Sequence, residues 1–306
     1  MSLINKILKR ADWEWHKYFD IIYRKCVKSP YVISYEECVD YILENNASVS
    51  RMGDGELAVI YGATLGFQSH NRELGKRLEE VMSNDSDGLL LCIPDTFEHL
   101  ERYNTVELNF WRAHHYYNRI RWYKHLRPTK KYGNTFLSRF YSMEFNKELS
   151  SKRIELLKKL WNNRDIIFVE GKDTKMGIGN DLFENAKSIR RILCPSKDAF
   201  SVYDTILNYI LNLQHKDNDL YILALGPTAT VLSVDLHNIG LQALDLGHLD
   251  IEYEWYRQGV KKKVPITGKF SNEAMILGLA DEFVVGAIVN EDYNNQIIAD
   301  LSGITK

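Results

Sequence analysis

Short apolar runs alternate with helical patterns along most of the chain, and this alternation limits the folds that the chain can adopt. Stretches with helical periodicity separate most of the runs, and they lie at 71–84, 150–161, 199–214 and 228–239. Strands separated by helices favour a mainly parallel sheet, because each helix carries the chain back across the sheet. We therefore predict an α/β fold with a mainly parallel sheet and crossover helices. The runs that read as strands are ASVSRM (47–52), GLLLCIP (88–94), RDIIFVEG (164–171), SIRRILCP (188–195), DLYILALG (219–226), LQALDLG (241–247) and EFVVGAIV (282–289).

Two segments depart from this alternation. Residues 3–28 are amphipathic, with seven Lys and Arg against three acids and a broad apolar side. Such a helix could attach the protein to an anionic membrane surface or to a partner, but more often it covers its own domain, and we favour the second use. Residues 100–145 are dense in aromatic and basic side chains and read as a helical insertion or lid. We predict an N-terminal helix in 1–34 and one domain in 35–306.

The composition excludes several classes of protein. Apolar residues make up 45% of the chain and charged residues 26%, as in ordinary soluble globular proteins. A formal net charge of −2 argues against a protein whose main task is to bind nucleic acid. The four cysteines show no C-x-x-C spacing, and the chain starts without the apolar core of a secretory signal. No run is long enough to span a bilayer, so we expect a cytoplasmic protein and leave open a contact of the N-terminal helix with the inner face of the membrane.

Ligands of open α/β sheets bind beyond the carboxyl ends of the strands, where loops lead into helices. The first such loop here is SRMGDGEL (50–57). Asp54 and Glu56 are two residues apart and could share one hard divalent cation, while Arg51 could contact a phosphate close to the backbone at Gly53. The alternative is that Asp54 caps a helix and Glu56 only favours its first turn.

The second loop, VEGKDTKMGIGNDLF (169–183), is rich in glycine and carries positive charge. Its glycines allow the backbone to fold tightly against a ligand, and a helix is predicted to begin at 180–182 with an N-terminus that attracts anions. The pattern matches neither the P-loop nor G-x-G-x-x-G, and a plain connecting turn is the alternative. The candidate phosphate-binding residues of this loop are Gly171, Thr174, Lys175, Gly177, Gly179 and Asn180.

The third loop, ILALGPTATVL (222–232), follows a strongly apolar strand that ends at Gly226. Pro227 suits the first turn of a helix, and Thr228 offers a hydroxyl. A nucleotide ribose or phosphate could therefore rest here. An ordinary turn from strand to helix explains the pattern equally well.

The fourth loop, LDLGHLDIEYEWY (244–256), crowds a histidine and several carboxylates behind a strand. We name His248, Asp250 and Glu252 as candidates for a base that deprotonates a hydroxyl, without ranking them. The H-E-x-x-H spacing of zinc enzymes is absent. An acidic surface stripe, with His248 in a structural role, is the alternative.

Two weaker signals remain. The stretch GNTFLSRFY (133–141) lies beside the aromatic insertion, and Arg139 in it could contact a nucleotide or sugar or simply pack. Lys261, Lys262 and Lys263 form a short charge run of the kind usually found in a solvated turn.

Each loop has a structural explanation, but their combination suits one kind of chemistry. A nucleotide diphosphate held with a divalent cation, beside a base for an incoming hydroxyl, would use all four loops. Glycosyl transfer from a sugar nucleotide needs these parts. A metal-dependent nucleotide or sugar-phosphate hydrolase is the alternative enzyme, and a saccharide- or nucleotide-binding module is the non-catalytic alternative.

Three blocks of the sequence carry a resemblance to a known family. They are SRMGDGEL, GKDTKMGIGNDLFENAKSIRRILCPSKDAF and LALGPTATVLSVDLHNIGLQALDLGHLDIEYEW. They are similar to the GT-D-fold glycosyltransferases, a bacterial family first catalogued as a domain of unknown function. The similarity runs from about residue 35 to about residue 290, and the two long blocks are its most specific part.

The resemblance implies a Rossmann-like α/β domain, a UDP-sugar donor such as UDP-glucose, and Mn²⁺ or Mg²⁺. It places the Asp-x-Glu motif of the family, implied in metal and diphosphate binding, on Asp54 and Glu56. The chain departs from the family at Lys175, where Arg is common, and at Phe140, where Ser-Arg-Pro-Tyr is usual. A Lys keeps the charge but loses bidentate geometry. A saccharide or glycoprotein acceptor is expected, and the acceptor, the linkage and self-association stay open.

Overall fold

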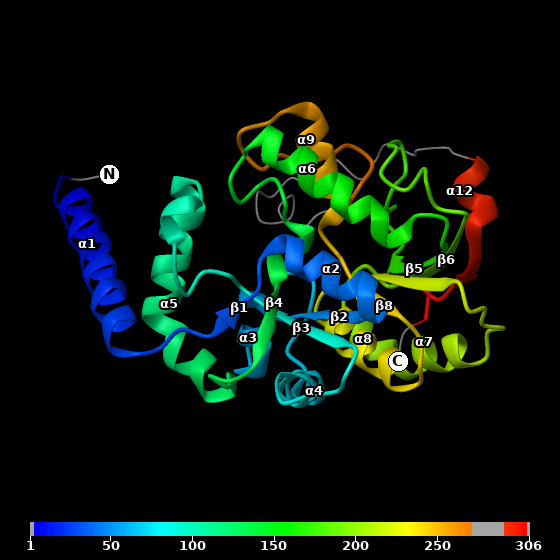
Figure 1. The fold of residues 1–306 in the computed structure, drawn as a ribbon, viewed down its shortest axis with the longest axis horizontal. Helices are drawn as coiled ribbons and strands as arrows, with labels where there is room; N and C mark the ends of the chain where they lie inside the picture. The colour runs from blue at the N-terminus through cyan, green and yellow to red at the C-terminus, as the bar shows by residue number, and fades with distance from the viewer. Residues whose placement is uncertain (1–2, 271–290, 305–306) are drawn as a thin grey trace.

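The protein is built around a parallel β-sheet with helices on both of its faces (Figure 1). The computed structural model describes residues 3–270 and 291–304, and over these residues the sheet has nine strands in the order β1-β4-β3-β2-β8-β7-β5-β6-β9, every neighbouring pair being parallel. The strands are β1 (Tyr31–Val32), β2 (Ser48–Arg51), β3 (Leu89–Ile93), β4 (Lys131–Asn134), β5 (Asp165–Gly171), β6 (Ser188–Cys194), β7 (Asp219–Ala224), β8 (Ala243–Asp245) and β9 (Ile297–Asp300).

Alternate residues of the strands fill two separate cores, because successive side chains point to opposite faces of a sheet. In β3, Leu89, Leu91 and Ile93 face one core, which α4, α7 and α8 cover. Leu90 and Cys92 face the other, which α2, α6 and α9 cover. The helices of the described chain are α1 (Leu3–Cys26), α2 (Tyr35–Asn45), α3 (Asp54–Ile60), α4 (Arg72–Met82), α5 (Thr105–His125), α6 (Lys147–Lys158), α7 (Tyr203–Leu211), α8 (Pro227–Asn238), α9 (Leu249–Gln258) and α12 (Glu291–Gln296).

Local sequence signals explain several helix ends. Ser34 and Glu37 form a reciprocal capping box at the start of α2, and Asn46 ends that helix in the left-handed conformation. The Asn71 side chain accepts a hydrogen bond from the Leu74 N–H at the start of α4. The predicted helices therefore form close to their predicted bounds.

The middle of the sheet is a topological switch point. Strands β2 and β8 are neighbours, but the helices that follow them leave toward opposite faces: Leu57 of α3 belongs to one core and Leu249 of α9 to the other. In open α/β sheets, ligands bind at the carboxyl edge where loops diverge in this way, and we call this edge between β2 and β8 the crevice. This crevice positions the candidate site.

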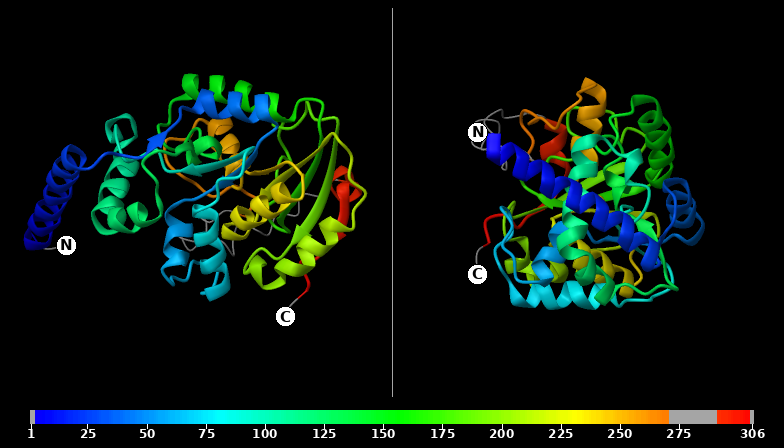
Figure 2. Two further views of the ribbon diagram at one scale, coloured as in Figure 1. Left: turned by 60° about the horizontal axis from the view of Figure 1, so that its bottom comes forward. Right: turned by 90° about the vertical axis from the view of Figure 1, so that its left-hand side faces the viewer.

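Helices α1 and α5 lie side by side at one end of the molecule, and α5 stands between α1 and the sheet (Figures 1 and 2). The prediction that the N-terminal helix covers its own chain is confirmed, although it packs against the aromatic helix α5 rather than the sheet. No helix of the described chain combines the length and hydropathy that crossing a membrane requires.

The predicted α/β fold with a mainly parallel sheet is confirmed, with two differences in detail. The strands β1, β4 and β9 are additional, and β4 lies inside the segment read as a purely helical insertion. The helix predicted to begin at 180–182 is wrong, because residues 172–187 form successive turns that lead into β6. The predicted strand EFVVGAIV (282–289) lies outside the described residues.

Candidate functional site

Arg51 ties together three chain segments at the crevice. Its Nε donates to the Asp245 carbonyl oxygen at 2.5 Å and its Nη2 to Asp245 Oδ1 at 2.8 Å. Its Nη1 donates to Ser138 Oγ at 2.6 Å, in the loop after β4. The guanidinium of this mostly buried side chain is thus committed to protein groups, so it acts as a structural brace here rather than as an exposed phosphate ligand.

Asp245, the last residue of β8, is a site residue that the sequence reasoning missed. Its side chain is buried, it pairs with Arg51, and its Oδ2 lies 3.3 Å from Thr230 Oγ1. Its position at the end of an apolar strand is the sequence signal that identifies it, beside the denser acidic segment that follows.

The two carboxylates of the Asp-x-Glu motif occupy different positions in the first turn of α3. Asp54 is the first residue of the helix and is exposed. Glu56 is half-buried, and its Oε2 accepts a hydrogen bond from the Gly53 N–H at 2.8 Å. A Cβ on Gly53 would lie 2.9 Å from that oxygen, so a larger residue there would displace the Glu56 carboxylate. The helix-capping alternative is therefore wrong for Asp54, because Gly53 is the N-cap residue, whereas Glu56 does stabilise the first turn and uses its Oε2 for this contact.

Negative charge accumulates at this turn. Burial, together with the charges of Asp245 and Asp54, raises the pKa of Glu56 to about 7. Carboxylates that repel one another relax when a cation binds between them. Across residues 3–270 and 291–304 there is no group of three or more His, Cys, Asp or Glu side chains placed to hold a metal ion. The pair Asp54 and Glu56 therefore fits a cation whose remaining ligands are phosphate oxygens and water, which is how Mg²⁺ usually binds nucleotides.

Helix α5 brings a histidine to the same turn. The carboxylate of Asp54 raises the pKa of His114, but burial lowers it more, so that the net shift is downward. The indole Nε1 of Trp122 donates to His114 Nε2 at 2.9 Å and fixes the ring. The aromatic insertion thus forms one wall of the crevice. Its sequence could not indicate this role, because a local pattern does not show which distant residues a segment contacts.

His248 and Arg139 meet at the start of α9. Arg139 Nη2 and His248 Nε2 are 2.8 Å apart, although the residues come from loops after different strands. A guanidinium only donates, so Nε2 of His248 accepts this hydrogen bond and the imidazole is neutral with its proton on Nδ1. Both side chains are partly exposed, and the structure joins two residues that the sequence proposed separately.

Asp250 holds the glycine-rich loop. Its Oδ1 accepts hydrogen bonds from the Gly177 N–H at 2.9 Å and from Asn180 Nδ2 at 2.7 Å, and its Oδ2 accepts one from Lys269 Nζ at 2.7 Å. The side chain is 2% exposed. These contacts favour a positioning role over that of a base.

Glu252 holds the loop after β4 in the same way. Its Oε2 accepts hydrogen bonds from the N–H groups of Tyr141 at 3.0 Å and Ser142 at 2.7 Å, and its Oε1 accepts one from the Ser142 hydroxyl. Burial raises the pKa of Glu252, whereas the charge of Arg139 lowers it. The fully buried carboxylate has no open path to a substrate hydroxyl, so its contacts also favour positioning.

Left-handed residues and a buried ion pair shape the glycine-rich loop. Lys175, Gly177 and Gly179 have φ angles of 49°, 77° and 80°. Below them, Glu170 pairs with Arg191, which also donates to the Met176 carbonyl oxygen at 2.8 Å. This backbone continues in turns, so the loop has no helix N-terminus to offer a ligand. Several of its N–H groups already donate within the protein, among them those of Met176 to Glu170 and Gly177 to Asp250.

Asn180 explains the missing helix. Its Nδ2 donates to Asp250 and to Glu254 Oε1 at 2.7 Å each, and its Oδ1 accepts the Leu182 N–H at 3.1 Å. These bonds fasten the chain to α9 where a helix would otherwise begin.

The turn into α8 contains an unsatisfied hydroxyl. Gly226 has a φ of 56°, and a Cβ there would lie 2.6 Å from Phe67 Cε2. Pro227 occupies the first position of the helix. Thr228 Oγ1 is buried and makes no hydrogen bond with any described residue. A buried polar atom beside a helix N-terminus fits a site for an anionic or hydroxyl-bearing ligand.

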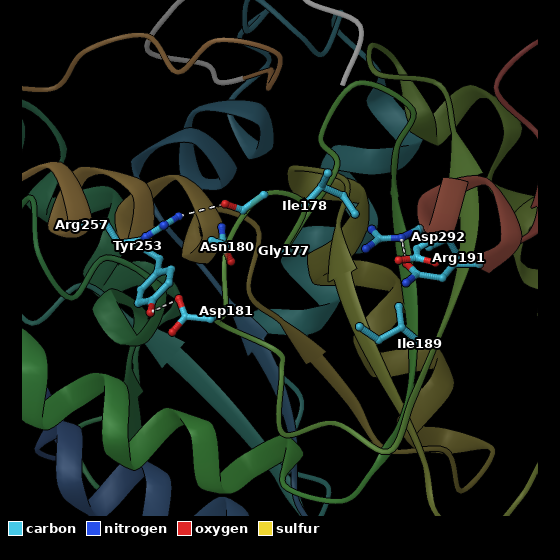
Figure 3. A pocket seen from close by; sticks show the side chains of 11 residues that line it. Gly177, Ile178, Asn180, Asp181, Ile189, Arg191, Tyr253, Arg257 and Asp292 are labelled. Atoms are coloured by element: carbon cyan, nitrogen blue, oxygen red, sulfur yellow. Dashed lines mark hydrogen bonds between the residues drawn. The ribbon is translucent and has the colours of Figure 1, made fainter. Parts of the chain in front are cut away.

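The glycine-rich loop also lines a polar hollow of about 710 Å³ (Figure 3). On its walls, Tyr253 Oη donates to Asp181 Oδ1 at 2.8 Å and Arg257 Nη1 donates to the Gly179 carbonyl oxygen at 3.0 Å. The predicted residues thus fall into two groups: Gly177, Gly179 and Asn180 line the hollow, whereas Arg51, Asp54 and Glu56 lie at the crevice. The segment from β8 into α9 contacts both groups, because Asp245 pairs with Arg51 and Asp250 accepts hydrogen bonds from Gly177 and Asn180.

Known proteins are similar to this chain in both sequence and architecture. Residues 49–274 match the family model described as glycosyltransferase GT-D fold. A probable glycosyl transferase Gly of Streptococcus gordonii is 39% identical over 274 residues, which are 89% of this chain and 39% of that protein. Glycosyltransferase GlyD of Streptococcus pneumoniae serotype 4 is 38% identical over 86% of this chain and 32% of its own length. The chain therefore spans 32% to 39% of the length of these relatives.

Solved structures extend the similarity to three dimensions. A structure described as the domain of unknown function 1792, with a distinct glycosyltransferase fold, is 38% identical and matches 92% of this chain and 99% of its own with a TM-score of 0.85. A structure described as a new glycosyltransferase from Streptococcus sanguinis is 39% identical and matches 89% of this chain and all of its own with a TM-score of 0.83.

Proposed function

The chain belongs to the GT-D-fold glycosyltransferases, and from that premise we propose that it transfers a hexose, glucose by the resemblance, from a UDP-sugar to a hydroxyl of a saccharide or glycoprotein acceptor with the help of Mn²⁺ or Mg²⁺. The observation that carries the proposal is the convergence of Asp54, Glu56 and Asp245 at the crevice between β2 and β8. A diphosphate with its cation suits this position, because the cation would offset the clustered negative charge.

Asp54 and the free oxygen of Glu56 would hold the cation, which would supply positive charge to the diphosphate as the bond to the sugar breaks. Asp245 keeps the strand ends together through Arg51. The Thr228 hydroxyl and the N-terminus of α8 would bind the donor through hydrogen bonds.

His248 is the base that we propose for the acceptor hydroxyl. Unlike Asp250 and Glu252, it keeps part of its surface exposed and carries no proton on Nε2. The hydrogen bond from Arg139 must break before Nε2 can accept a proton, and a bound diphosphate would attract the guanidinium away. The acceptor oxygen would then form a bond to the anomeric carbon while the bond from that carbon to the diphosphate breaks.

The test is a donor screen that measures UDP release with and without saccharide acceptors, in Mn²⁺, Mg²⁺ or chelator. We expect release that depends on the cation and rises with an acceptor, and we expect Asp54→Asn to abolish it. Glu73→Gln is the matched control, because Glu73 is also an exposed acid in the first turn of a helix but lies in α4. Release that responds to no acceptor would favour the hydrolase instead.

Calorimetry separates the metal-bridged site from a simple binding module. UDP should bind more tightly with Mn²⁺ than with chelator, and the Asp54→Ala, Glu56→Ala double variant should lose that difference. If the affinity for UDP changed neither with Mn²⁺ nor with the double substitution, the proposal would be refuted.

A further inference from the structure

One surface of the molecule is apolar and basic, and the proposed reaction does not use it. It lies on the pair of helices α1 and α5 at the end of the molecule (Figure 2). We call its apolar side chains the outer face; each exposes between 46% and 74% of its surface. The outer face consists of Trp15, Tyr18 and Ile22 on α1 and Val106, Phe110, Tyr117 and Ile120 on α5.

The contacts between the helices show how this surface is oriented. The His16 ring lies 4.5 Å from that of Tyr116, and the Tyr23 ring 5.8 Å from that of Tyr123, so the two helices run in the same direction. Positions 15, 18 and 22 form one flank of α1, and positions 106, 110, 117 and 120 form one flank of α5. With this pairing, both flanks turn to the same side of the helix pair, while Trp111 and Trp122 of α5 face the interior.

Interior contacts hold the pair in place. Asp20 pairs with Arg119 at 2.5 Å and with Arg24 at 2.5 Å, and both Asp20 and Arg119 are buried. The Trp15 indole N–H donates to the Tyr116 hydroxyl at 3.0 Å. The outer face is therefore part of a fixed two-helix layer, and its apolar side chains stay exposed even though α1 is docked.

The charge of the helix pair indicates what covers it. Residues 3–26 and 105–125 contain ten Lys and Arg against four Asp and Glu, whereas the whole chain has a net charge of −2. Each helix carries an exposed lysine, Lys25 on α1 and Lys124 on α5. Two copies of the chain that met through this layer would bring like charges together, whereas an anionic surface would neutralise them.

We propose that the outer face binds an anionic lipid surface. The apolar side chains would enter the boundary between headgroups and acyl chains, and the lysines would contact lipid phosphates. Trp and Tyr suit this boundary because each joins an apolar ring to a polar atom. The α5 stripe from Val106 to Ile120 extends over about 21 Å, enough for a flat and shallow contact rather than insertion across the membrane.

The test is cosedimentation of the full chain with vesicles of phosphatidylcholine alone or mixed with phosphatidylglycerol. We expect binding to the mixed vesicles, weaker binding at high salt, and little binding to phosphatidylcholine. The variant Tyr18→Ser, Ile22→Ser, Ile120→Ser should bind about tenfold more weakly. Leu43→Ser, Leu211→Ser, Ile239→Ser is the matched control, because these residues are also 45–47% exposed but lie elsewhere, and it should bind like the parent.

A second pair of measurements keeps the test decisive if the first variant folds poorly. The variant Lys25→Glu, Lys124→Glu should lose binding to the mixed vesicles and keep its circular dichroism spectrum. The fluorescence difference between the parent chain and Trp15→Phe should shift to the blue when vesicles are added, because Trp15 is 59% exposed in water.

Three outcomes would overturn the proposal. They are a parent chain that does not bind mixed vesicles, equal loss in the outer-face variant and its control, and a dimer in sedimentation velocity that the outer-face variant abolishes. The last result would assign the surface to self-association. UDP release with an acceptor in solution tests the proposed transfer separately, so failure of one proposal does not imply failure of the other.

Discussion

Asp250 and Glu252 are buried charges, and each is compensated mainly by hydrogen bonds from a loop. Buried carboxylates of this kind are costly unless their oxygens are satisfied. Here Glu252 accepts hydrogen bonds from the loop after β4, and Asp250 accepts them from the glycine-rich loop and from Lys269. At the scale of single residues, the contacts of Asp250 and Glu252 favour a role in organising the loops, and His248 is the residue that we propose as the base.

This division of roles predicts different effects of two substitutions on transfer. His248→Gln should lower kcat by roughly 10²–10⁴-fold and remove the loss of activity on the acid side of the pH profile, because no imidazole is left to protonate. Glu252→Gln should lower stability and activity but leave the shape of the pH profile unchanged, since it presents an amide to the N–H groups of Tyr141 and Ser142. The measurement is the pH dependence of kcat for acceptor-dependent UDP release. A pH profile that changes shape in Glu252→Gln would return the role of base to Glu252.

At the scale of elements, two glycines of one loop experience different surroundings. Gly177 and Gly179 both have positive φ angles, but a Cβ on Gly177 would lie 2.7 Å from Phe183 Cδ2, whereas a Cβ on Gly179 meets nothing within 4 Å. Phe183 is buried against Trp161 and Phe168, so it cannot move aside easily.

Gly177→Ala should therefore lower the free energy of unfolding by roughly 2–4 kcal/mol, and Gly179→Ala by about 1 kcal/mol, the cost of the left-handed conformation alone. Urea unfolding measures both. Equal losses of free energy of unfolding in the two variants would show that the Phe183 ring moves aside without destabilising the protein.

The start of β5 carries a pH-dependent contribution to stability. Asp165 accepts hydrogen bonds from the Ser188 hydroxyl at 2.6 Å and Asn218 Nδ2 at 3.1 Å, and these bonds, with Lys187, hold its pKa well below its usual range. A carboxyl whose pKa is lower in the folded state stabilises the protein above the unfolded pKa of about 4 and loses that contribution as the pH falls.

We expect Asp165→Asn to lower the free energy of unfolding by about 1 kcal/mol at pH 7, with a difference from the parent that shrinks below about pH 4. Unfolding by urea at a series of pH values measures this difference. Glu148→Gln, at a surface carboxylate that is 84% exposed, should not change the pH dependence. If the difference in free energy of unfolding between Asp165→Asn and the parent stayed constant down to pH 3, this would contradict a stabilising role of the ionised Asp165 carboxylate.

At the scale of the whole molecule, α1 depends on one buried ion pair for its docking. Asp20→Ala would leave Arg119 buried without its carboxylate, and releasing α1 is the least costly way to hydrate the guanidinium. We expect trypsin to cleave this variant at Lys17, Arg24 or Lys25 faster than the parent, and to leave the rest of the chain intact.

Limited proteolysis followed by mass spectrometry measures this release. Asp40→Ala removes an exposed aspartate from α2 and should leave the cleavage rate unchanged. Protection of α1 in Asp20→Ala equal to that in the parent would show that aromatic contacts alone hold the helix.

The chain order of strands and helices, and the loops that carry the candidate site, followed from the sequence by itself. Apolar runs and helical periodicity are local signals, and they marked β2, β3, β5, β6, β7 and β8 with the helices between them. The strands β1 and β9 lie at the two edges of the sheet and have no fully buried residue, so they leave no apolar run in the sequence. They form because a neighbouring strand supplies the hydrogen bonds.

Only the tertiary structure decided which side chains meet. Arg51 and Asp245 are 194 residues apart in the chain and join because β2 and β8 pair at the switch point. The direction of the α9 carboxylates also depends on partners in distant loops, and these contacts favour a positioning role for Asp250 and Glu252 over that of a base. Local pattern fixes which residues stand at the strand ends; the order of strands across the sheet fixes their neighbours, because a contact between distant segments has no periodicity along the chain.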